Sequence, residues 1–239
     1  MQSTLQSEGV STDQMVLDDQ QRTSTVIVDL DDSGERSFTF MVKPSADQFL
    51  IESDLPNFNQ GEWLHSCSIA LANEPSRSTT FAAMNTLKAA NGFVSFDPNL
   101  RDEVWADPSE IKPTVLKAVA LADVLKFSEE ELEFLTGQSG IEEGLSHLNL
   151  GSQVLAIVTL GAKGAYVHFN GEGRVLSGIK VTPVDTTGAG DAFVSGVLAY
   201  LASQDEWRTW QAIEQAVAYG NTCGALVTTE KGAMTLCQA

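Results

Sequence analysis

The stretch DTTGAGDAF, residues 185–193, constrains this chain more than any other segment. Its two glycines let the backbone approach a ligand closely. Apolar residues follow at helical spacing, Phe193, Val197 and Leu201, and predict a helix directly behind the loop. The start of a helix presents unpaired N–H groups and the positive end of its dipole, which suit a phosphate. Asp191 in that first turn is therefore best explained as a base that deprotonates a hydroxyl while the amides hold a phosphoryl group.

A purely structural explanation of this stretch is also available. A glycine-rich loop with Thr186 or Thr187 as the helix cap accounts for the threonines and for one glycine. It does not require Gly-Ala-Gly-Asp in that order. The sequence therefore favours a phosphoryl-binding loop over a simple cap.

Composition limits the classes of function. The chain has 239 residues, 43% of them apolar and 19% charged, as in an ordinary globular protein with one large α/β domain or two small ones. A formal net charge of -18 argues against nucleic acid and anionic membranes, although not against a nucleotide. No apolar run is long enough to span a membrane, and the N-terminus lacks signal-peptide features. Three cysteines without a close pair favour a reducing, cytoplasmic compartment.

Strand and helix patterns alternate from Trp63 onward. We expect strands at 64–70, 93–97, 124–127 and 154–159, antiparallel segments at 165–169 and 174–181, and helices at 76–90, 109–122, 129–135, 189–202 and 210–226. This alternation predicts an α/β fold with a mostly parallel sheet flanked by helices. Ligands of such sheets bind beyond the carboxyl ends of the strands.

Three parts of the chain differ in character. Residues 1–24 are polar and acidic, and are predicted to be the end of an N-terminal helix and a loop. Residues 25–43 form a predicted β-hairpin with Phe38 and Phe40 on one face. The hairpin either packs on a core, or serves as a lid or dimer clasp that presents an aromatic ring to a ligand. Residues 44–239 form the α/β core.

Polar residues follow three of the predicted strands. Arg101 in DPNLR has a planar fork of donors suited to vicinal hydroxyls or phosphate, although a surface Arg fits the loop equally well. Lys126 and Glu131 follow the next strand, where the acid either holds a metal-bound water or only complements the helix dipole. The segment TLGAKG, residues 159–164, either cradles phosphates or is a simple turn.

DTTGAGDAF resembles the C-terminal signature of the ribokinase-like (PfkB) carbohydrate kinases. DPNLR, the strand with Lys126 through Glu131, TLGAKG and GALVTTEKGAM are similar to that family in order and spacing, so the resemblance covers essentially the whole chain. The segments GERSFTFMVKPSAD and DPNLRDEVW are most similar to bacterial fructokinases, with aminoimidazole riboside kinase a close relative. The resemblance implies a ribokinase-like fold with a small β lid.

The resemblance also implies site residues, position by position. It implies Asp191 as the catalytic base, with an anion hole formed by the amides of Gly188, Ala189 and Gly190, and sugar contacts from Arg101 and Phe40. It implies nucleotide or metal-water positions at Lys126, Glu131, Thr159, Leu160, Gly161, Ala162, Lys163, Gly164, Asn221 and Gly224. A monovalent cation, usually K⁺, would be held largely through backbone carbonyls by Asp185, Thr187, Val227, Glu230 and Gly232.

The expected reaction is Mg²⁺-assisted transfer of the γ-phosphoryl group of ATP to a primary hydroxyl, most plausibly of fructose to give fructose 6-phosphate, by a homodimer formed through the lid. Aminoimidazole riboside, ribose or a nucleoside are alternative acceptors. The family's opening strand with a sugar-binding Asp, its Gly-Gly loop and its last helix have no counterpart here. We therefore expect either a piece of a longer kinase or a truncated relative, and in the latter case a non-catalytic sugar- or nucleotide-binding protein is a rival.

Overall fold

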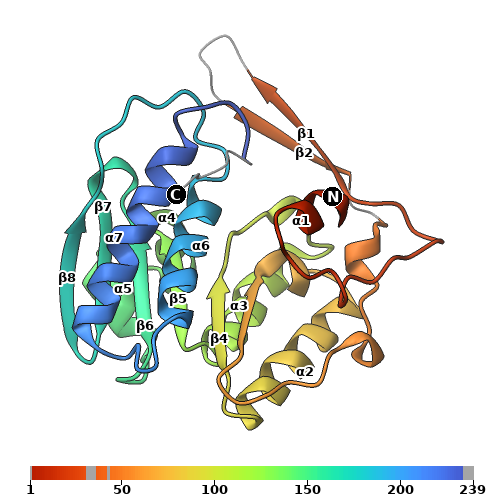
Figure 1. The fold of residues 1–239 in the computed structure, drawn as a ribbon, viewed down its shortest axis with the longest axis horizontal. Helices are drawn as coiled ribbons and strands as arrows, with labels where there is room; N and C mark the ends of the chain where they lie inside the picture. The colour runs from red at the N-terminus through yellow and green to blue at the C-terminus, as the bar shows by residue number, and fades with distance from the viewer. Residues whose placement is uncertain (1, 31–35, 42–43, 234–239) are drawn as a thin grey trace. The chain divides into compact units, whose positions relative to one another are not determined.

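The computed structural model describes residues 2–30, 36–41 and 44–233. The chain divides into two compact units (Figure 1). The first comprises Met1–Val94 and Asn99–Leu121, and the second comprises Ser95–Pro98 and Ala122–Ala239. Each unit is described by itself below.

The first unit contains the N-terminal helix, the hairpin and the first strand–helix pair. Its helices and strands are α1 (Gln2–Ser7), β1 (Thr25–Leu30), β2 (Arg36–Met41), β3 (Trp63–Cys67), α2 (Ser76–Ala89) and α3 (Ile111–Val119). β1 and β2 pair antiparallel, with Val26 opposite Phe40, so the two predicted strands are present. The turn that joins them, and the last two residues of the predicted hairpin, lie outside the described part of the chain.

The second unit is built on the larger part of the sheet. β4 (Phe93–Asp97) begins in the first unit and ends in the second. The other elements are β5 (Val124–Ser128), α4 (Glu129–Thr136), α5 (Ile141–His147), β6 (Leu155–Thr159), β7 (Gly164–Phe169), β8 (Glu172–Ser177), α6 (Ala189–Ala202) and α7 (Trp210–Val227). α6 and α7 cover one face of β5–β8, and α4 and α5 lie on the other (Figure 1).

The sheet is mixed, with strand order β3-β4-β5-β6-β7-β8. β4, β5 and β6 pair in parallel, whereas β7 and β8 add as an antiparallel pair at the end of the sheet. Phe127 and Ile157 on neighbouring strands, and Leu201 and Ile213 on the covering helices, are completely or almost completely buried. This core fixes the ends of β5 and β6, where the polar residues of interest lie.

α6 and α7 pack with their backbones close together. A Cβ atom on Gly220 would lie 2.8 Å from the carbonyl oxygen of Phe193, and one on Gly196 would lie 3.0 Å from the Cα atom of Gly220. Side chains at either position would force the helices apart. The two glycines therefore set how closely α7 approaches the first turn of α6.

Two of the strands end earlier than the sequence predicts, and one helix was not predicted. The strand expected at 64–70 ends at Cys67, where a short 3₁₀ helix, Ser68–Leu71, begins. β8 ends at Ser177, because the chain then leaves the sheet through Gly178, whose N–H donates to the Lys163 carbonyl. α5 was not predicted, because seven residues with a glycine among them carry little helical signal.

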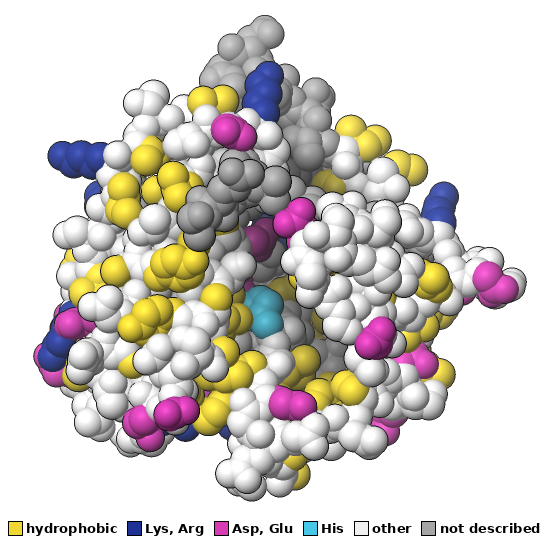
Figure 2. Space-filling view, viewed as in Figure 1, with side chains coloured by type: hydrophobic (Ala, Val, Ile, Leu, Met, Phe, Trp, Pro, Cys, Tyr) yellow, Lys and Arg dark blue, Asp and Glu magenta, His cyan; other side chains and the backbone are white. Residues whose placement is uncertain are grey.

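On the face drawn in Figure 2, the Lys and Arg side chains of the described residues are few and stand apart from one another. A nucleic-acid-binding face requires clustered basic groups. Among the described helices, none is both long and apolar enough to cross a membrane.

Candidate active site

The loop before α6 is shaped by a glycine in the left-handed region. Gly188 has φ 78° and precedes the first helical residue, Ala189. A Cβ atom at this position would also lie 2.9 Å from that of Ala233, so both conformation and space demand glycine. No side chain caps the helix, so the alternative explanation of this stretch, a cap by Thr186 or Thr187, does not apply.

The carboxylate of Asp185 organises the loop instead. Its Oδ1 accepts the N–H of Thr187 at 2.8 Å, and its Oδ2 accepts the N–H of Gly232 at 3.0 Å. The N–H groups of Val184 and Asp185 both donate to the carbonyl of Thr228, at 2.7 and 3.1 Å. These bonds join the loop to the chain that follows α7.

The residues predicted to hold a monovalent cation fall on these two joined segments. Asp185 and Thr187 come from the loop, and Val227, Glu230 and Gly232 from the end of α7 and the chain beyond it. Among the described residues, no group of three or more His, Cys, Asp or Glu side chains is arranged to hold a metal ion. A site of backbone carbonyls is a different kind of site, since its ligands belong to the main chain.

Lys126 lies beside the start of α6 and is paired with an acid. Its Nζ is 3.1 Å from Oδ1 and 2.9 Å from Oδ2 of Asp97, and the two side chains are 11% and 4% exposed. A Cβ atom on Gly190 would lie 3.4 Å from the Lys126 ammonium. The ends of β4 and β5 and the start of α6 therefore meet at this point.

The environment of Asp97 is strongly unfavourable to its charge. The pKa of Asp97 is raised to about 6, mainly by burial; Lys126 lowers it, and the carboxylates of Glu131 and Asp191 raise it. Three acids thus share the surroundings of one ammonium. Sequence reasoning had selected Arg101 from DPNLR and passed over Asp97, although an acid at the end of a buried strand is a usable signal.

Glu131 takes part in the start of α4. Its Oε2 accepts the N–H of Ser128 at 2.8 Å, while its own N–H donates to the Ser128 hydroxyl at 3.1 Å. This reciprocal capping box makes Ser128 the N-cap of α4, which begins at Glu129 as predicted. One oxygen of the Glu131 carboxylate is therefore held by the helix start.

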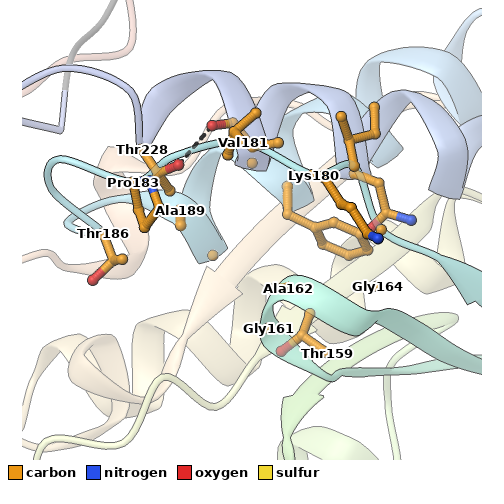
Figure 3. A pocket seen from close by; sticks show the side chains of 17 residues that line it. Thr159, Gly161, Ala162, Gly164, Lys180, Val181, Pro183, Thr186, Ala189 and Thr228 are labelled. Atoms are coloured by element: carbon orange, nitrogen blue, oxygen red, sulfur yellow. Dashed lines mark hydrogen bonds between the residues drawn. The ribbon is translucent and has the colours of Figure 1, made fainter.

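A cavity of about 510 Å³ opens beside the loop, entirely within the second unit. Several residues predicted to bind nucleotide or phosphoryl line it, namely Thr159, Gly161, Ala162, Gly164, Ala189, Gly190, Asn221 and Gly224. Lys126, Glu131, Leu160 and Lys163 are not among its lining residues. The labelled residues of the 159–164 turn lie on one side and Pro183, Thr186, Ala189 and Thr228 on the other (Figure 3).

Part of the cavity wall was missed by sequence reasoning. Residues 178–181 and Pro183 supply a wall that includes Ile179 and Val181, and Ala225 and Thr228 extend the contribution of α7. Residues 178–181 and Pro183 follow β8 as irregular chain and match no motif, so only the fold brings them to the site. Apolar walls next to glycine-rich backbone suit a flat base joined to phosphates, and the residues present therefore fit a nucleotide.

Hydrogen bonds hold the polar lining residues in place. Thr159 donates its hydroxyl to the carbonyl of Phe127 at 3.2 Å, and Asn221 donates its amide to the carbonyl of Ser177 at 3.2 Å. Gly224 lets α7 come close to the loop, since a Cβ atom there would lie 3.1 Å from the carbonyl oxygen of Ala189.

The two predicted sugar-contacting residues belong to the first unit. Arg101 donates from Nη1 to the carbonyl of Leu100 at 2.7 Å. Phe40 is a residue of β2, and its side chain lies outside the described part of the structure.

Comparison with known proteins gives one consistent result. The model of the pfkB family of carbohydrate kinases matches residues 1–239. The fructokinase of Vibrio alginolyticus is 58% identical over 235 residues, which cover 98% of this chain and 76% of that protein.

Solved structures agree with the sequence comparison. Two crystal structures of the fructokinase of Vibrio cholerae O395 each align with a TM-score of 0.94 and 59% identity, covering 98% of this chain and 76% of theirs. One holds fructose, ADP and a calcium ion, and the other, a double mutant, holds fructose, ADP and a potassium ion. Aminoimidazole riboside kinase from Salmonella enterica, complexed with aminoimidazole riboside and an ATP analogue, aligns with a TM-score of 0.88 and 34% identity, covering 98% of this chain and 76% of that structure.

The family model spans the loop, the cavity and the paired acid and lysine alike, and the identity to curated members extends over nearly the whole chain. This chain belongs to the pfkB family of carbohydrate kinases.

Proposed function

We propose that this chain is an ATP-dependent fructokinase that transfers the γ-phosphoryl group of ATP to the 6-hydroxyl of fructose. The observation that carries the proposal is the position of Ala189 and Gly190 on the wall of the cavity, directly before Asp191, in a chain 59% identical to a protein that holds fructose and ADP. A nucleotide in the cavity would direct its phosphates toward this loop.

Asp191 is proposed as the catalytic base. Its carboxylate takes the proton of the attacking hydroxyl, whose oxygen forms a bond to the γ-phosphorus as the bond to the ADP oxygen breaks. The amides of Gly188, Ala189 and Gly190 stabilise the charge that develops on the phosphoryl oxygens. Arg101 and Phe40 are proposed to bind the sugar.

The cavity residues are proposed to hold the nucleotide. These are Thr159, Gly161, Ala162, Gly164, Asn221 and Gly224 of the cavity wall. Leu160 and Lys163 of the same turn are proposed to assist them, with Lys126 and Glu131 nearer the phosphates. Mg²⁺ would neutralise phosphate charge when bound with ATP. K⁺ would sit behind the loop at Asp185, Thr187, Val227, Glu230 and Gly232, and the hydrogen bonds from Asp185 to Thr187 and Gly232 support this assignment because they hold both segments together.

The hairpin of residues 25–43 is proposed to have two roles, as a lid and as a dimer contact. Residues 25–43 are proposed to act as a lid, carried by the helix end and loop of 1–24 and attached to the kinase core of 44–239. The same hairpin is proposed to join two chains as a homodimer, for which the exposed side chains of Val26, Ile27 and Met41 offer apolar surface. The compartment is proposed to be the cytoplasm, where ATP is available.

An acceptor panel tests the function. Release of ADP is measured with fructose, aminoimidazole riboside, ribose and a nucleoside at equal concentration, with Asp191→Asn as the inactive control. The proposal expects the highest kcat/KM with fructose. A higher value with aminoimidazole riboside would assign the chain to the second activity, which the 0.88 TM-score to that kinase favours next. ATP binding by calorimetry without turnover of any acceptor would instead support a non-catalytic binding protein.

A further inference from the structure

The geometry points to Asp97 as a positioning residue that holds the Lys126 ammonium against the phosphoryl-binding loop at Gly190. Held there, the ammonium of Lys126 contacts the transferred phosphoryl group. This inference rests on the proposed kinase activity. It assigns a role to a residue that the sequence motif leaves unexplained.

The contacts fix the ammonium in one place. Nζ of Lys126 lies 3.1 and 2.9 Å from the two carboxylate oxygens of Asp97, so both oxygens hold it. The same ammonium would lie 3.4 Å from a Cβ atom on Gly190. Because Gly190 has no side chain, nothing of its own separates Lys126 from the first turn of α6.

The number of hydrogen-bond donors supports the same conclusion. An ammonium group has three N–H donors. Among the described residues, both hydrogen bonds of Lys126 go to the one carboxylate of Asp97, so they use at most two donors and at least one is left for a ligand. A pair made only for stability has no need to leave a donor facing a helix N-terminus.

The carboxylates around the pair repel a phosphoryl group, so a cation is needed beside them. The carboxylates of Glu131 and Asp191 both act on Asp97, so the incoming phosphates meet three acids. A fixed cation beside Gly190 offsets this repulsion, and fixing it in advance avoids the cost of ordering a long side chain during the reaction.

Stability alone is a weak reason for the pair. Desolvation of two charges in a buried site often cancels their attraction. The raised pKa of Asp97 shows that here the cost of burying its charge outweighs the attraction to Lys126.

The Asp123–Arg208 pair of the same unit is a second largely buried ion pair and serves as a control. Its atoms are 3.0 Å apart, with side chains 12% and 24% exposed, and Arg208 also donates to the Gln153 carbonyl and stacks on Trp207.

Asp97→Asn and Asp123→Asn form a matched pair of variants. Each removes the acid of a largely buried ion pair, but only Asp97 is paired with the lysine that lies beside Gly190. We expect Asp97→Asn to lower kcat roughly tenfold to a hundredfold, the range for a misplaced group in an active site, and Asp123→Asn to keep kcat within about twofold of wild type. Equal kcat values in the two variants would overturn the inference.

A double-mutant comparison tests whether Asp97 acts through Lys126. Residues that act as one unit have non-additive effects. The kcat of Lys126→Met/Asp97→Asn should therefore be within about twofold of that of Lys126→Met alone. Independent roles would make the two losses multiply, and that result would contradict the inference.

Two further measurements keep the test decisive. ATP and ADP affinities by calorimetry do not require turnover: Asp97→Asn should weaken ATP binding more than ADP binding, and equal weakening would reject the contact to the transferred group. If the wild type phosphorylates no sugar, the proposed function fails, yet this binding comparison still tests the inference.

If Asp97→Asn does not fold, Asp97→Glu replaces it, because this variant retains the charge but moves the carboxylate by one methylene. A wild-type kcat in Asp97→Glu would overturn the inference.

Discussion

Gly232 donates its backbone N–H to Oδ2 of Asp185 at 3.0 Å, across 47 positions of sequence. The other oxygen of the same carboxylate accepts the N–H of Thr187 at 2.8 Å. One side chain thus joins the loop before α6 to the chain after α7. An ionised carboxylate can accept both bonds, whereas an amide has one acceptor oxygen.

Asp185→Asn should therefore loosen one of these two segments. A hydrogen bond to a charged group contributes roughly 1.5–3 kcal/mol, so the free energy of unfolding should fall by about that amount or less. The KCl concentration that gives half-maximal activity should rise severalfold, since the proposed cation ligands lie on both segments. A KCl titration of activity at constant ionic strength measures this effect, with Asp205→Asn, an exposed acid, as the control. An unchanged half-maximal concentration would contradict the assigned cation site.

Asp191→Asn should remove phosphoryl transfer without unfolding the protein. The side chain is exposed in the first turn of α6, so its substitution should change the free energy of unfolding by no more than about 0.5 kcal/mol. Loss of a general base lowers turnover by roughly 10²–10⁴-fold. Steady-state kinetics and urea denaturation of the same preparation check both statements. Turnover near the wild-type level would exclude Asp191 as the base.

Asp97 should make stability depend on pH in a definite direction. Its pKa rises from 3.8 to about 6 on folding, mainly because of burial. Between these values the folded protein keeps a proton that the unfolded chain has released, so stability falls as pH rises from about 4 to about 6. The shift corresponds to on the order of 3 kcal/mol, at about 1.4 kcal/mol per unit.

Because other groups titrate in the same range, the comparison must be made with Asp97→Asn. The difference in free energy of unfolding, wild type minus variant, should decrease by about 3 kcal/mol between pH 4 and pH 6 and then stay level. Urea denaturation at intervals of half a pH unit measures it. A difference that increases with pH would mean that attraction to Lys126 outweighs the burial of Asp97.

Two glycines of the cavity wall should differ in their tolerance of alanine. Both have positive φ, 57° at Gly161 and 105° at Gly164. A Cβ atom on Gly161 meets nothing within 4 Å, whereas one on Gly164 would be 2.1 Å from the carbonyl oxygen of Leu176. Gly161→Ala should cost about 1 kcal/mol, from backbone strain alone.

Gly164→Ala adds a backbone clash to the strain, so its cost should exceed about 3 kcal/mol and it should displace β8 from β7. Denaturation curves of the two variants compare these costs. Equal costs would show that β8 moves away easily, and the close pairing at this end of the sheet would then be unimportant to stability.

Much of this protein could be predicted from short sequence patterns. Phe93–Asp97 and Ala189–Ala202 match their predicted ranges without a change, because a buried apolar run and a strong helical period carry their own boundaries. Ser128 with Glu131 gave the start of α4, since a capping box is a local set of bonds. DTTGAGDAF predicted a loop followed by a helix, because its glycines and the apolar residues behind it are also a local pattern.

Other features depend on contacts between distant residues. The pairing of Asp97 with Lys126 joins two strands 29 positions apart, and the bond from Gly232 to Asp185 spans 47. No local pattern reports such contacts, because they form only when the parallel order of β4 and β5 and the packing of α6 on α7 bring the segments together. The loop before α6 is a second case: the Asp185 carboxylate accepts the N–H groups of Gly232 and of Thr187, just before Gly188.

The sequence by itself determined the chemistry of the loop, the family and the order of strands and helices, because these follow from residue type and spacing. The tertiary structure decided which charges share one environment and which irregular segment completes the cavity wall. The physical reason is that burial and electrostatic interaction depend on distance in space. Asp97 shows this most clearly: in the sequence it is one acid of 32 Asp and Glu residues, and in the fold it is a buried acid paired with a lysine beside Gly190.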